Sequence, residues 1–233
     1  MDESVRLSGV AILLPCFNEM GNITAAVAEA RHAAMSAAHA HEIIVVDDGS
    51  TDGTRELGRT LAECDPYVRL VVHETNRGYG AALRSGIAAA RMPWILLTDA
   101  DLQFDLEQLV DITPLTTDYD LIIGRRTPRR DQFYRRVYGH TWNWLVRRML
   151  ELPVRDVDCA FKLARTDLLQ SLALRSTGAM ISPELVARSL AQGARLVEAD
   201  VAHRPRVAGE QSGANPRVIL HALSELRALR LSH

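Results

Sequence analysis

The residues best suited to chemistry in this chain stand just after short apolar runs. Asp99-Ala100-Asp101 follows the run Trp94–Thr98, and Gln103 offers another oxygen two residues further on. Such oxygens favour Mg²⁺ or Mn²⁺, which proteins hold with one or two carboxylates plus the phosphate oxygens of a substrate. A plain helix cap before the next segment is the structural alternative for these aspartates. The motif therefore predicts a divalent-metal site, subject to support from the rest of the chain.

Similar polar clusters follow four other apolar runs. Singly, each has a structural explanation: Asp47 and Asp48 would form a turn, and Glu19 would cap a helix. In open α/β sheets, however, ligands bind beyond the carboxyl ends of the strands. Taken together at successive strand ends, the clusters favour a binding pocket. They are Pro15 to Glu19, Asp47 to Thr54, Asn76 to Gly80, and Gly124 to Arg126.

The elements that must position these clusters alternate between strand and helix patterns. Apolar runs of four to six residues between helical patterns indicate strands covered on both faces, hence a mostly parallel sheet. The first ~125 residues are predicted to form an open α/β domain. The predicted strands are Val10–Leu14, Glu42–Val46, Val68–His73, Trp94–Thr98 and Asp120–Ile123, and the predicted helices are Asn22–Ser36, Asp52–Glu63, Tyr79–Arg91 and Asp105–Ile112.

The alternation becomes less regular after residue 125. The patterns there predict helices at Arg129–Leu150, Pro183–Gln192 and Val218–Arg230, and strands at Cys159–Leu163 and Arg195–Val201. No repeat and no low-complexity linker interrupts the chain. With 233 residues, the chain is expected to form one domain over 1–233.

Composition and motifs exclude several classes of protein. No apolar stretch approaches the roughly 20 residues of a membrane span, and no basic start precedes an apolar run, so neither a span nor a signal peptide is expected. The three cysteines form no C-x-x-C pair, which favours reduced thiols over a zinc site. There is no P-loop, and the stretch from Gly78 lacks the third glycine of a dinucleotide motif.

The charge is unevenly distributed. Arg125–Arg148 holds eight arginines and one aspartate, a net +7 within a chain of net charge −2. Aromatic residues lie among these arginines, a pattern of membrane-interface segments, although a solvated helix packed on the sheet would also explain it. Nucleic-acid binding is disfavoured because the rest of the chain is acidic and contains no recognised module. The aromatic residues are Tyr134, Tyr138, Trp142 and Trp144.

The motifs resemble, in order, those of family-2 glycosyltransferases of the GT-A fold, within the dolichyl- or polyprenyl-phosphate mannose synthase branch. They are PCFNEMGNI, VVDDGSTDGT, NRGYGAAL, TDADLQFD, IIGRR, DVDCAFKL and HRPRVAGEQSG, and they span about residues 9 to 217. The resemblance implies a single sheet between helices. A Rossmann-like nucleotide-sugar half would cover about 9–125, and an acceptor-binding, membrane-facing half about 126–233. It also implies a GDP-mannose or UDP-glucose type donor and a polyprenyl phosphate acceptor on the cytosolic side of the membrane.

Individual roles follow from the same resemblance. Pro15, Phe17 and Glu19 would line the nucleoside pocket, with Asp47 near the base or ribose. Asp99, Ala100 and Asp101 would meet the donor, and Gln103 would complete the metal site. Arg126 would hold the acceptor phosphate, helped by Arg135 or Arg136. Arg206 would close over the donor diphosphate, assisted by Arg204 or Arg217 because Glu210 to Gly213 lacks the lysine often found there.

The chemistry of the acceptor distinguishes two reactions that enzymes of this family could catalyse: transfer to a phosphate and transfer to a hydroxyl. A phosphate monoester, with a second pKa of about 6, is dianionic at neutral pH and needs arginines rather than a general base. A sugar hydroxyl needs a carboxylate base. The region Ile181 to Glu184 has no aspartate beside Glu184, which favours the phosphate acceptor. Transfer to a glycan or small-molecule hydroxyl is the alternative.

Two further functions would use similar residues. A sugar-phosphate nucleotidyltransferase would need a glycine-rich basic loop after the first strand, and PCFNEMGN is neither. A nucleotide-sugar-binding protein without activity would have a broken Asp-x-Asp motif, which is intact here. The sequence therefore predicts an inverting, metal-dependent hexosyltransferase. The enzyme is expected in the cytoplasm, bound peripherally to the membrane, and a separate membrane protein is a possible partner.

Overall fold

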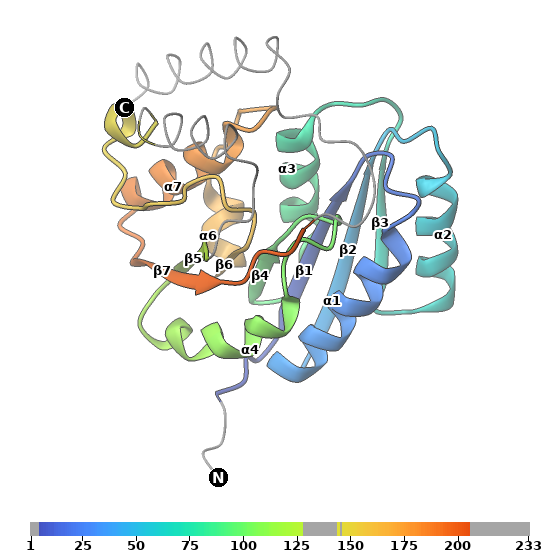
Figure 1. Ribbon diagram of the computed structural model, residues 1–233, viewed down its shortest axis with the longest axis horizontal. Coiled ribbons are helices and arrows are strands. Elements are labelled where there is room, and N and C mark those ends of the chain that lie inside the picture. Colours follow the sequence, from blue (N-terminus) through green and yellow to red (C-terminus); the bar gives the residue numbers. More distant parts are fainter. Residues whose placement is uncertain (1–4, 128–143, 145, 206–233) are drawn as a thin grey trace.

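The computed structural model describes residues 5–127, 144 and 146–205 (Figure 1). Its centre is one seven-stranded sheet in the order β3-β2-β1-β4-β6-β5-β7. All neighbouring strands pair in parallel except β6, which is antiparallel to both β4 and β5. The strands are β1 (Val10–Cys16), β2 (His41–Asp48), β3 (Val68–His73), β4 (Trp94–Leu97), β5 (Leu121–Arg126), β6 (Lys162–Arg165) and β7 (Leu196–Val201).

Helices cover both faces of this sheet (Figure 1). Alternate residues of a strand point to opposite faces. Val10, Ile12 and Leu14 therefore pack with α1 (Ile23–Ala37), whereas Ala11 and Leu13 pack with α3 (Tyr79–Ala89). The first face also receives α2 (Thr54–Cys64), η1 (Leu106–Gln108) and α4 (Leu109–Ile112), which η2 (Thr113–Thr117) follows; the second receives α6 (Thr166–Ser171) and α7 (Ile181–Ala191).

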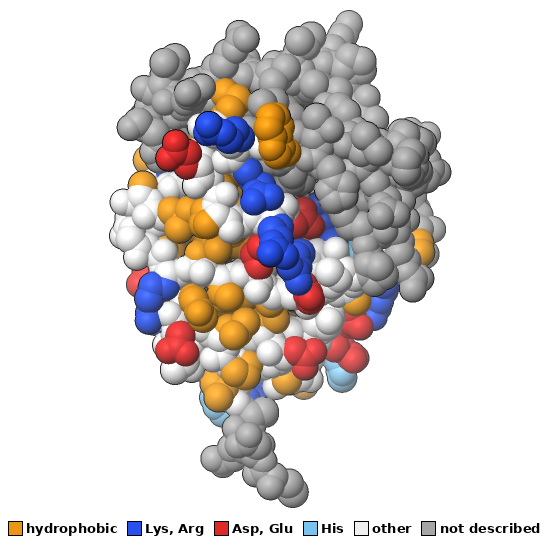
Figure 2. Space-filling model, turned by 60° about the vertical axis from the view of Figure 1, so that its left-hand side comes forward, with side chains coloured by type: hydrophobic (Ala, Val, Ile, Leu, Met, Phe, Trp, Pro, Cys, Tyr) orange, Lys and Arg blue, Asp and Glu red, His pale blue; other side chains and the backbone are white. Residues whose placement is uncertain are grey.

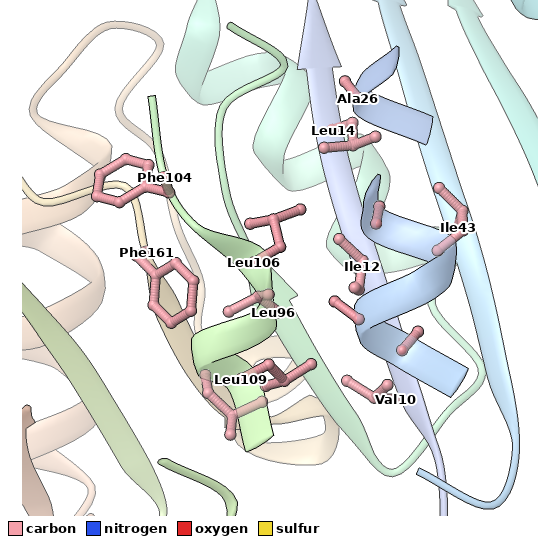
Figure 3. Packing of buried hydrophobic residues seen from close by; sticks show 14 of the residues in the cluster. Val10, Ile12, Leu14, Ala26, Ile43, Leu96, Phe104, Leu106, Leu109 and Phe161 are labelled. Carbon is pink, nitrogen blue, oxygen red and sulfur yellow. The ribbon is translucent and has the colours of Figure 1, made fainter. Parts of the chain in front are cut away.

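The core between β1, β4 and α1 continues into the residues just before and within β6. Figure 3 shows Phe104 and Phe161 beside Leu96 and Leu106, with Ile12 closer to α1. The two phenylalanine rings lie 5.8 Å apart, centroid to centroid. Full burial of such a side chain contributes about 1.5–3 kcal/mol, so this packing fixes the loop after β4 against the segment before β6.

Element types agree with the sequence prediction, but several boundaries differ. Strand β5 extends to Arg126 because it pairs with β7 along that length, from Leu121↔Leu196 to Arg126↔Val201. Strand β6 begins at Lys162, not Cys159, because Cys159 lies in a turn closed by its N–H on the Asp156 carbonyl.

Helix predictions differ in similar ways. Helix α7 starts at Ile181, two residues before the predicted Pro183. The predicted helix Asp105–Ile112 is divided into η1 and α4. Of the predicted helix Arg129–Leu150, the described residues are Trp144 and 146–150, all helical. The predicted helix Val218–Arg230 lies outside the described residues.

Candidate active site

The loops after β1, β2 and β4 converge around the buried thiol of Cys16. This thiol ends β1, and its pKa is raised well above the ordinary value, first by burial and then by nearby carboxylates. Those carboxylates come from the end of β2 and from the loops after β1, β2 and β4, so three of the five predicted polar clusters lie close together. Their concentrated negative charge suits a cation. The carboxylates belong to Glu19, Asp47, Asp99 and Asp52.

The loop after β1 is braced by the loop after β2. Asn18 has a φ of 56°. Its side-chain oxygen accepts a hydrogen bond from the Thr51 backbone N–H, and its own backbone N–H donates to the Ser50 hydroxyl. Glu19 donates its N–H to the Thr54 hydroxyl at 2.9 Å. This reciprocal network holds the strained turn and leaves the Phe17 ring 46% exposed at its rim.

Two other predicted nucleoside-pocket residues are partly covered. Pro15 is the penultimate residue of β1 and is half-buried. The Glu19 carboxylate accepts a 2.6 Å hydrogen bond from the Asn22 side chain. Asn22 stands at the N-cap of α1 but makes no side-chain cap hydrogen bond. The nucleoside contacts of Pro15, Phe17 and Glu19 stay predictions.

Asp47 is fully buried and already has protein partners. One carboxylate oxygen accepts the Ser50 N–H at 3.1 Å, and the other accepts Arg55 Nε at 2.9 Å. Arg55 also donates to the His73 carbonyl at 2.8 Å. The predicted contact of Asp47 with the base or ribose therefore involves a carboxylate held in place by Arg55, a residue that sequence reasoning missed.

Its neighbour Asp48 organises the loop after β3. Its carboxylate binds the His73 ring at 2.6 Å and accepts the N–H groups of Arg77 and Gly78. The other ring nitrogen of His73 contacts the Ser85 hydroxyl on α3 at 2.8 Å. These bonds join β2, β3 and α3 and give Asp48, the last residue of β2, a structural role beside Asp47.

The Asp-x-Asp motif lies at the carboxyl end of β4. Asp101 is 6% exposed, Ala100 is buried, and Asp99 is partly buried. The Tyr79 hydroxyl is hydrogen-bonded to Asp99; burial first, and then the charge of this carboxylate, raise the tyrosine pKa well above its ordinary value. Tyr79 was not singled out from the sequence, yet it fixes one of the two predicted metal ligands.

Gln103 follows through a tight turn with Leu102 at a φ of 61°. Its backbone N–H donates to the Asp101 carboxylate at 3.2 Å, and its side-chain amide nitrogen donates to the Arg204 carbonyl at 3.3 Å. Two carboxylates and one amide oxygen match the hard donors of a Mg²⁺ or Mn²⁺ ion that shares substrate phosphates. Within the described residues, no group of three His, Cys, Asp or Glu side chains stands ready to hold a metal. Asp99, Asp101 and Gln103 stay the predicted ligands.

The glycines after β3 serve close packing. Gly78 has a φ of 93°, and an added Cβ there would lie 2.5 Å from the Thr177 carbonyl oxygen. At Gly80 a Cβ would lie 2.5 Å from the Ser176 carbonyl oxygen, and its N–H donates to Thr177 at 2.8 Å. These glycines therefore seat the segment before α7 on the start of α3, which agrees with the exclusion of a dinucleotide loop.

Arg126, the predicted acceptor-binding arginine, ends β5 and forms a two-pronged ion pair with Asp156. Its Nε and Nη2 atoms lie 2.8 and 2.7 Å from the two carboxylate oxygens. The guanidinium is 15% exposed, and its pKa stays above the ordinary value because the Asp156 bonds and charge outweigh the cost of burial. Arg135, Arg136, Arg206 and Arg217 lie outside the described residues, so their predicted roles stay predictions.

Lys162, the only lysine of the chain, is fully buried beside this pair. It stands opposite Leu97 of β4 and Ile123 of β5, and its ammonium contacts the Cys159 carbonyl and the Ser182 hydroxyl. Burial lowers its pKa, whereas burial raises the pKa of Cys159 to about 12. The Cys159 thiol is therefore protonated, and Lys162 ties the segment before β6 to α7.

Glu184 is a structural anchor in α7. Its side chain has no exposed surface and accepts the N–H groups of Arg175 and Ser176 at 2.7 to 3.0 Å, plus Arg188 Nε at 2.8 Å. Burial alone would raise its pKa, but these donors outweigh burial and lower it. A carboxylate held by so many donors is poorly suited to accept a proton from a substrate.

The helical residues before β6 present a cationic and aromatic surface. Trp144 is 64% exposed, and Arg148 is exposed beside it. They border a hollow of about 260 Å³ shared with Arg147, Glu151 and Leu152. Figure 2 shows one face of the molecule, where blue basic side chains run downward with red acidic and orange apolar side chains among them. No helix in the described ranges has the length and apolar character needed to cross a membrane.

Comparison with known proteins identifies the class of enzyme. Residues 11–172 match the profile of Glycosyl transferase family 2. An uncharacterized glycosyltransferase of Mycobacterium tuberculosis (strain ATCC 25618 / H37Rv) is 32% identical over 205 residues, which cover 86% of this chain and 88% of that protein. The chain is a glycosyltransferase. It belongs to family 2, as its motifs indicated.

Two further similarities concern acceptor class and fold. The dodecaprenyl-phosphate galacturonate synthase of Rhizobium johnstonii is 29% identical over 236 residues, which cover 98% of this chain and 70% of that protein. Glucosyl-3-phosphoglycerate synthase from Mycobacterium tuberculosis, solved with Mn²⁺, uridine diphosphate and phosphoglyceric acid, matches with a TM-score of 0.70 at 22% identity, covering 94% of this chain and 78% of that one. The fold is GT-A, as predicted.

Proposed function

We propose that this glycosyltransferase moves a hexose, mannose or glucose, from a nucleotide sugar of the GDP-mannose or UDP-glucose type to a polyprenyl phosphate. The transfer inverts the anomeric carbon and takes place at the cytoplasmic face of a membrane, where the protein binds peripherally. The observation that carries the choice of acceptor is the engagement of Glu184 by backbone N–H groups and Arg188.

The acceptor-side carboxylates support a phosphate over a hydroxyl. A hydroxyl acceptor must lose a proton to a base, yet Glu184 is saturated with donors and Asp156 is bound to Arg126. A phosphate monoester arrives already dianionic at neutral pH, with its second pKa near about 6. Arg126 supplies the charge that would bind it, with Arg135 or Arg136 assisting.

On the donor side, the chain supplies positioning and countercharge. Asp99, Asp101 and Gln103 would hold Mg²⁺ or Mn²⁺, and the bound ion would stabilise the negative charge of the leaving diphosphate. The Tyr79 bond to Asp99 keeps that ligand oriented. Arg206 would bind diphosphate oxygens through its two-pronged guanidinium.

Similarity to known proteins supports the same choice. The relative from Rhizobium johnstonii acts, by its name, on dodecaprenyl phosphate, and the similarity extends over 98% of this chain. The hydroxyl alternative has one supporting observation, since the fold also matches an enzyme named for glucosyl-3-phosphoglycerate synthesis.

The test is a transfer assay with two acceptors and several donors. The purified protein is incubated with Mn²⁺, labelled GDP-mannose, UDP-glucose or UDP-galacturonate, and either a short prenyl phosphate or 3-phosphoglycerate. We expect label in the organic extract with a hexose donor. Label only in 3-phosphoglycerate would favour the hydroxyl alternative, and a galacturonate-only product would overturn the sugar.

A further inference from the structure

The ion pair between Arg126 and Asp156 has a directional geometry. Both carboxylate oxygens of Asp156 are used, one by Nε and one by Nη2, and the Arg126 backbone N–H adds a 3.3 Å contact. The two N–H groups of Nη1 stand outside this pair. A guanidinium held along one edge can bind a second anion only through the remaining nitrogen and the outer N–H of Nη2.

Asp156 is itself held through its own backbone groups. Its N–H donates to the side-chain carboxylate of Glu198 on β7 at 3.0 Å, as does the N–H of Arg155 at 2.7 Å. Its carbonyl accepts the N–H of Cys159 at 3.2 Å, and the residue is 5% exposed. The carboxylate therefore has a fixed position, and it transmits that position to the guanidinium.

The sheet register places this pair near the donor site. Leu97 of β4 and Ile123 of β5 both pair with Lys162 of β6, so they lie at the same height in the sheet. Asp99 lies two residues after Leu97, and Arg126 lies three residues after Ile123, toward the same edge of the sheet. One strand, β6, separates β4 from β5, which gives two strand spacings, roughly 10 Å. A sugar and the phosphate that attacks it fit within such a span.

We propose that Asp156 is a positioning residue that orients Arg126, so that the Nη1 edge of the guanidinium presents the acceptor phosphate to the anomeric carbon. The proposal rests on the proposed function, in which Arg126 holds that phosphate. It assigns Asp156 no contact with substrate. Its negative charge opposes binding of a dianion, so removing the charge should spare acceptor affinity while the loss of orientation lowers turnover.

The experiment is a double-mutant cycle with short prenyl phosphate as acceptor and saturating sugar donor. Asp156→Asn should lower kcat at least tenfold with an unchanged or lower acceptor KM. In an Arg126→Ala background, Asp156→Asn should cost less than twofold more, because Asp156 acts through Arg126. The matched control is Asp200→Asn, which breaks the equivalent two-pronged pair of the neighbouring Arg125 and should change kcat less than twofold.

Each other result contradicts the proposal in a recognisable way. Wild-type kcat in Asp156→Asn, a raised KM with normal kcat, or an equal loss in both backgrounds would exclude positioning through Arg126. If Arg126→Ala keeps wild-type acceptor kcat/KM, the proposed acceptor site itself is wrong. If Asp156→Asn does not fold, Arg126→Lys decides: it keeps the charge without the fork, and wild-type kcat in that variant overturns the proposal.

Discussion

Gln103 and Arg204 are joined by two hydrogen bonds that run in opposite directions. The Arg204 N–H donates to the Gln103 carbonyl at 2.7 Å, and the Gln103 side-chain amide donates to the Arg204 carbonyl at 3.3 Å. The adjacent pair Phe104 and His203 forms an isolated antiparallel bridge. The chain that leaves β7 is thus fastened to the loop that carries the predicted metal ligands, two residues before Arg206.

This attachment predicts different effects for the two nearby arginines. Arg206→Ala should lower kcat about 100-fold, because it removes the charge that is predicted to stabilise the leaving diphosphate. Arg204→Ala is the control, since its guanidinium is bound by Glu29 and Asp105 at 3.2 and 3.0 Å. Steady-state kinetics check both, and equal losses in the two variants would contradict the predicted clamp.

The metal site predicts a selective loss in Asp101→Ala. Turnover should fall below detection and Mn²⁺ affinity, measured by calorimetry with nucleoside diphosphate present, should fall at least tenfold. The melting temperature should change little, because a carboxylate at a strand end contributes little to the core. Asp111→Ala on the exposed side of α4 is the control. Full activity of Asp101→Ala, or of wild type in excess chelator, would refute the site.

Attack by the acceptor phosphate predicts inversion. With no enzyme nucleophile in the proposed step, a single in-line displacement turns an α-linked donor into a β-linked lipid phosphate. Proton and carbon NMR coupling at the anomeric position distinguishes the two products. An α-linked product, or a trapped glycosyl-enzyme adduct, would show that the step is not a single displacement.

The Trp144 and Arg148 surface predicts salt-sensitive binding to anionic vesicles. Arg148→Ala should weaken binding by about 1 kcal/mol, roughly fivefold, because each basic residue near an anionic surface contributes about that much. Arg59→Ala, an equally exposed arginine on α2, should bind like wild type. Turnover of a short prenyl phosphate should be unchanged in both. If Arg148→Ala binds anionic vesicles as strongly as wild type at low salt, this surface is exposed to solvent and does not contact the membrane.

Glu184 predicts a pH-dependent contribution to stability. Its folded pKa lies below the ordinary value of 4.5, so its stabilisation is complete above that value and disappears as pH falls through the lower folded pKa. Glu184→Gln should cost about 2 kcal/mol at pH 7, because hydrogen bonds to a buried charge are replaced by weaker ones. Denaturant unfolding should show this difference shrinking as the pH falls below 4.5. Glu107→Gln, whose side chain is 70% exposed, should show neither effect.

Local signals were enough to predict the strand ends and the residues that follow them. Apolar runs fixed β1 to β5, and short polar clusters marked the loops that meet around Cys16. Family motifs placed Asp99, Asp101 and Arg126 on those ends. Each of these inferences needed only neighbouring residues or a motif in order along the chain.

Contacts between distant residues could not be predicted in this way. Arg126 forms an ion pair with Asp156, which lies thirty residues later in the chain. The Glu184 carboxylate accepts the backbone N–H groups of Arg175 and Ser176. Lys162 is a further example. A lysine is normally exposed, and burying its ammonium in a central strand is costly unless the fold supplies hydrogen-bond partners such as the Ser182 hydroxyl. Such pairings depend on the sheet order, which the sequence pattern does not contain.

The insertion of β6 between β4 and β5 has a consequence for synthesis of the protein. When a ribosome has produced residues up to Arg126, β4 and β5 both exist as sequence, but the strand that joins them, Lys162–Arg165, has not yet been made. The nascent chain up to Arg126 therefore exposes the unpaired backbone of β4, a site at which chains can associate wrongly. Closure of the sheet, and with it formation of the Arg126–Asp156 pair, must wait until the residues from Asp156 to Arg165 have emerged.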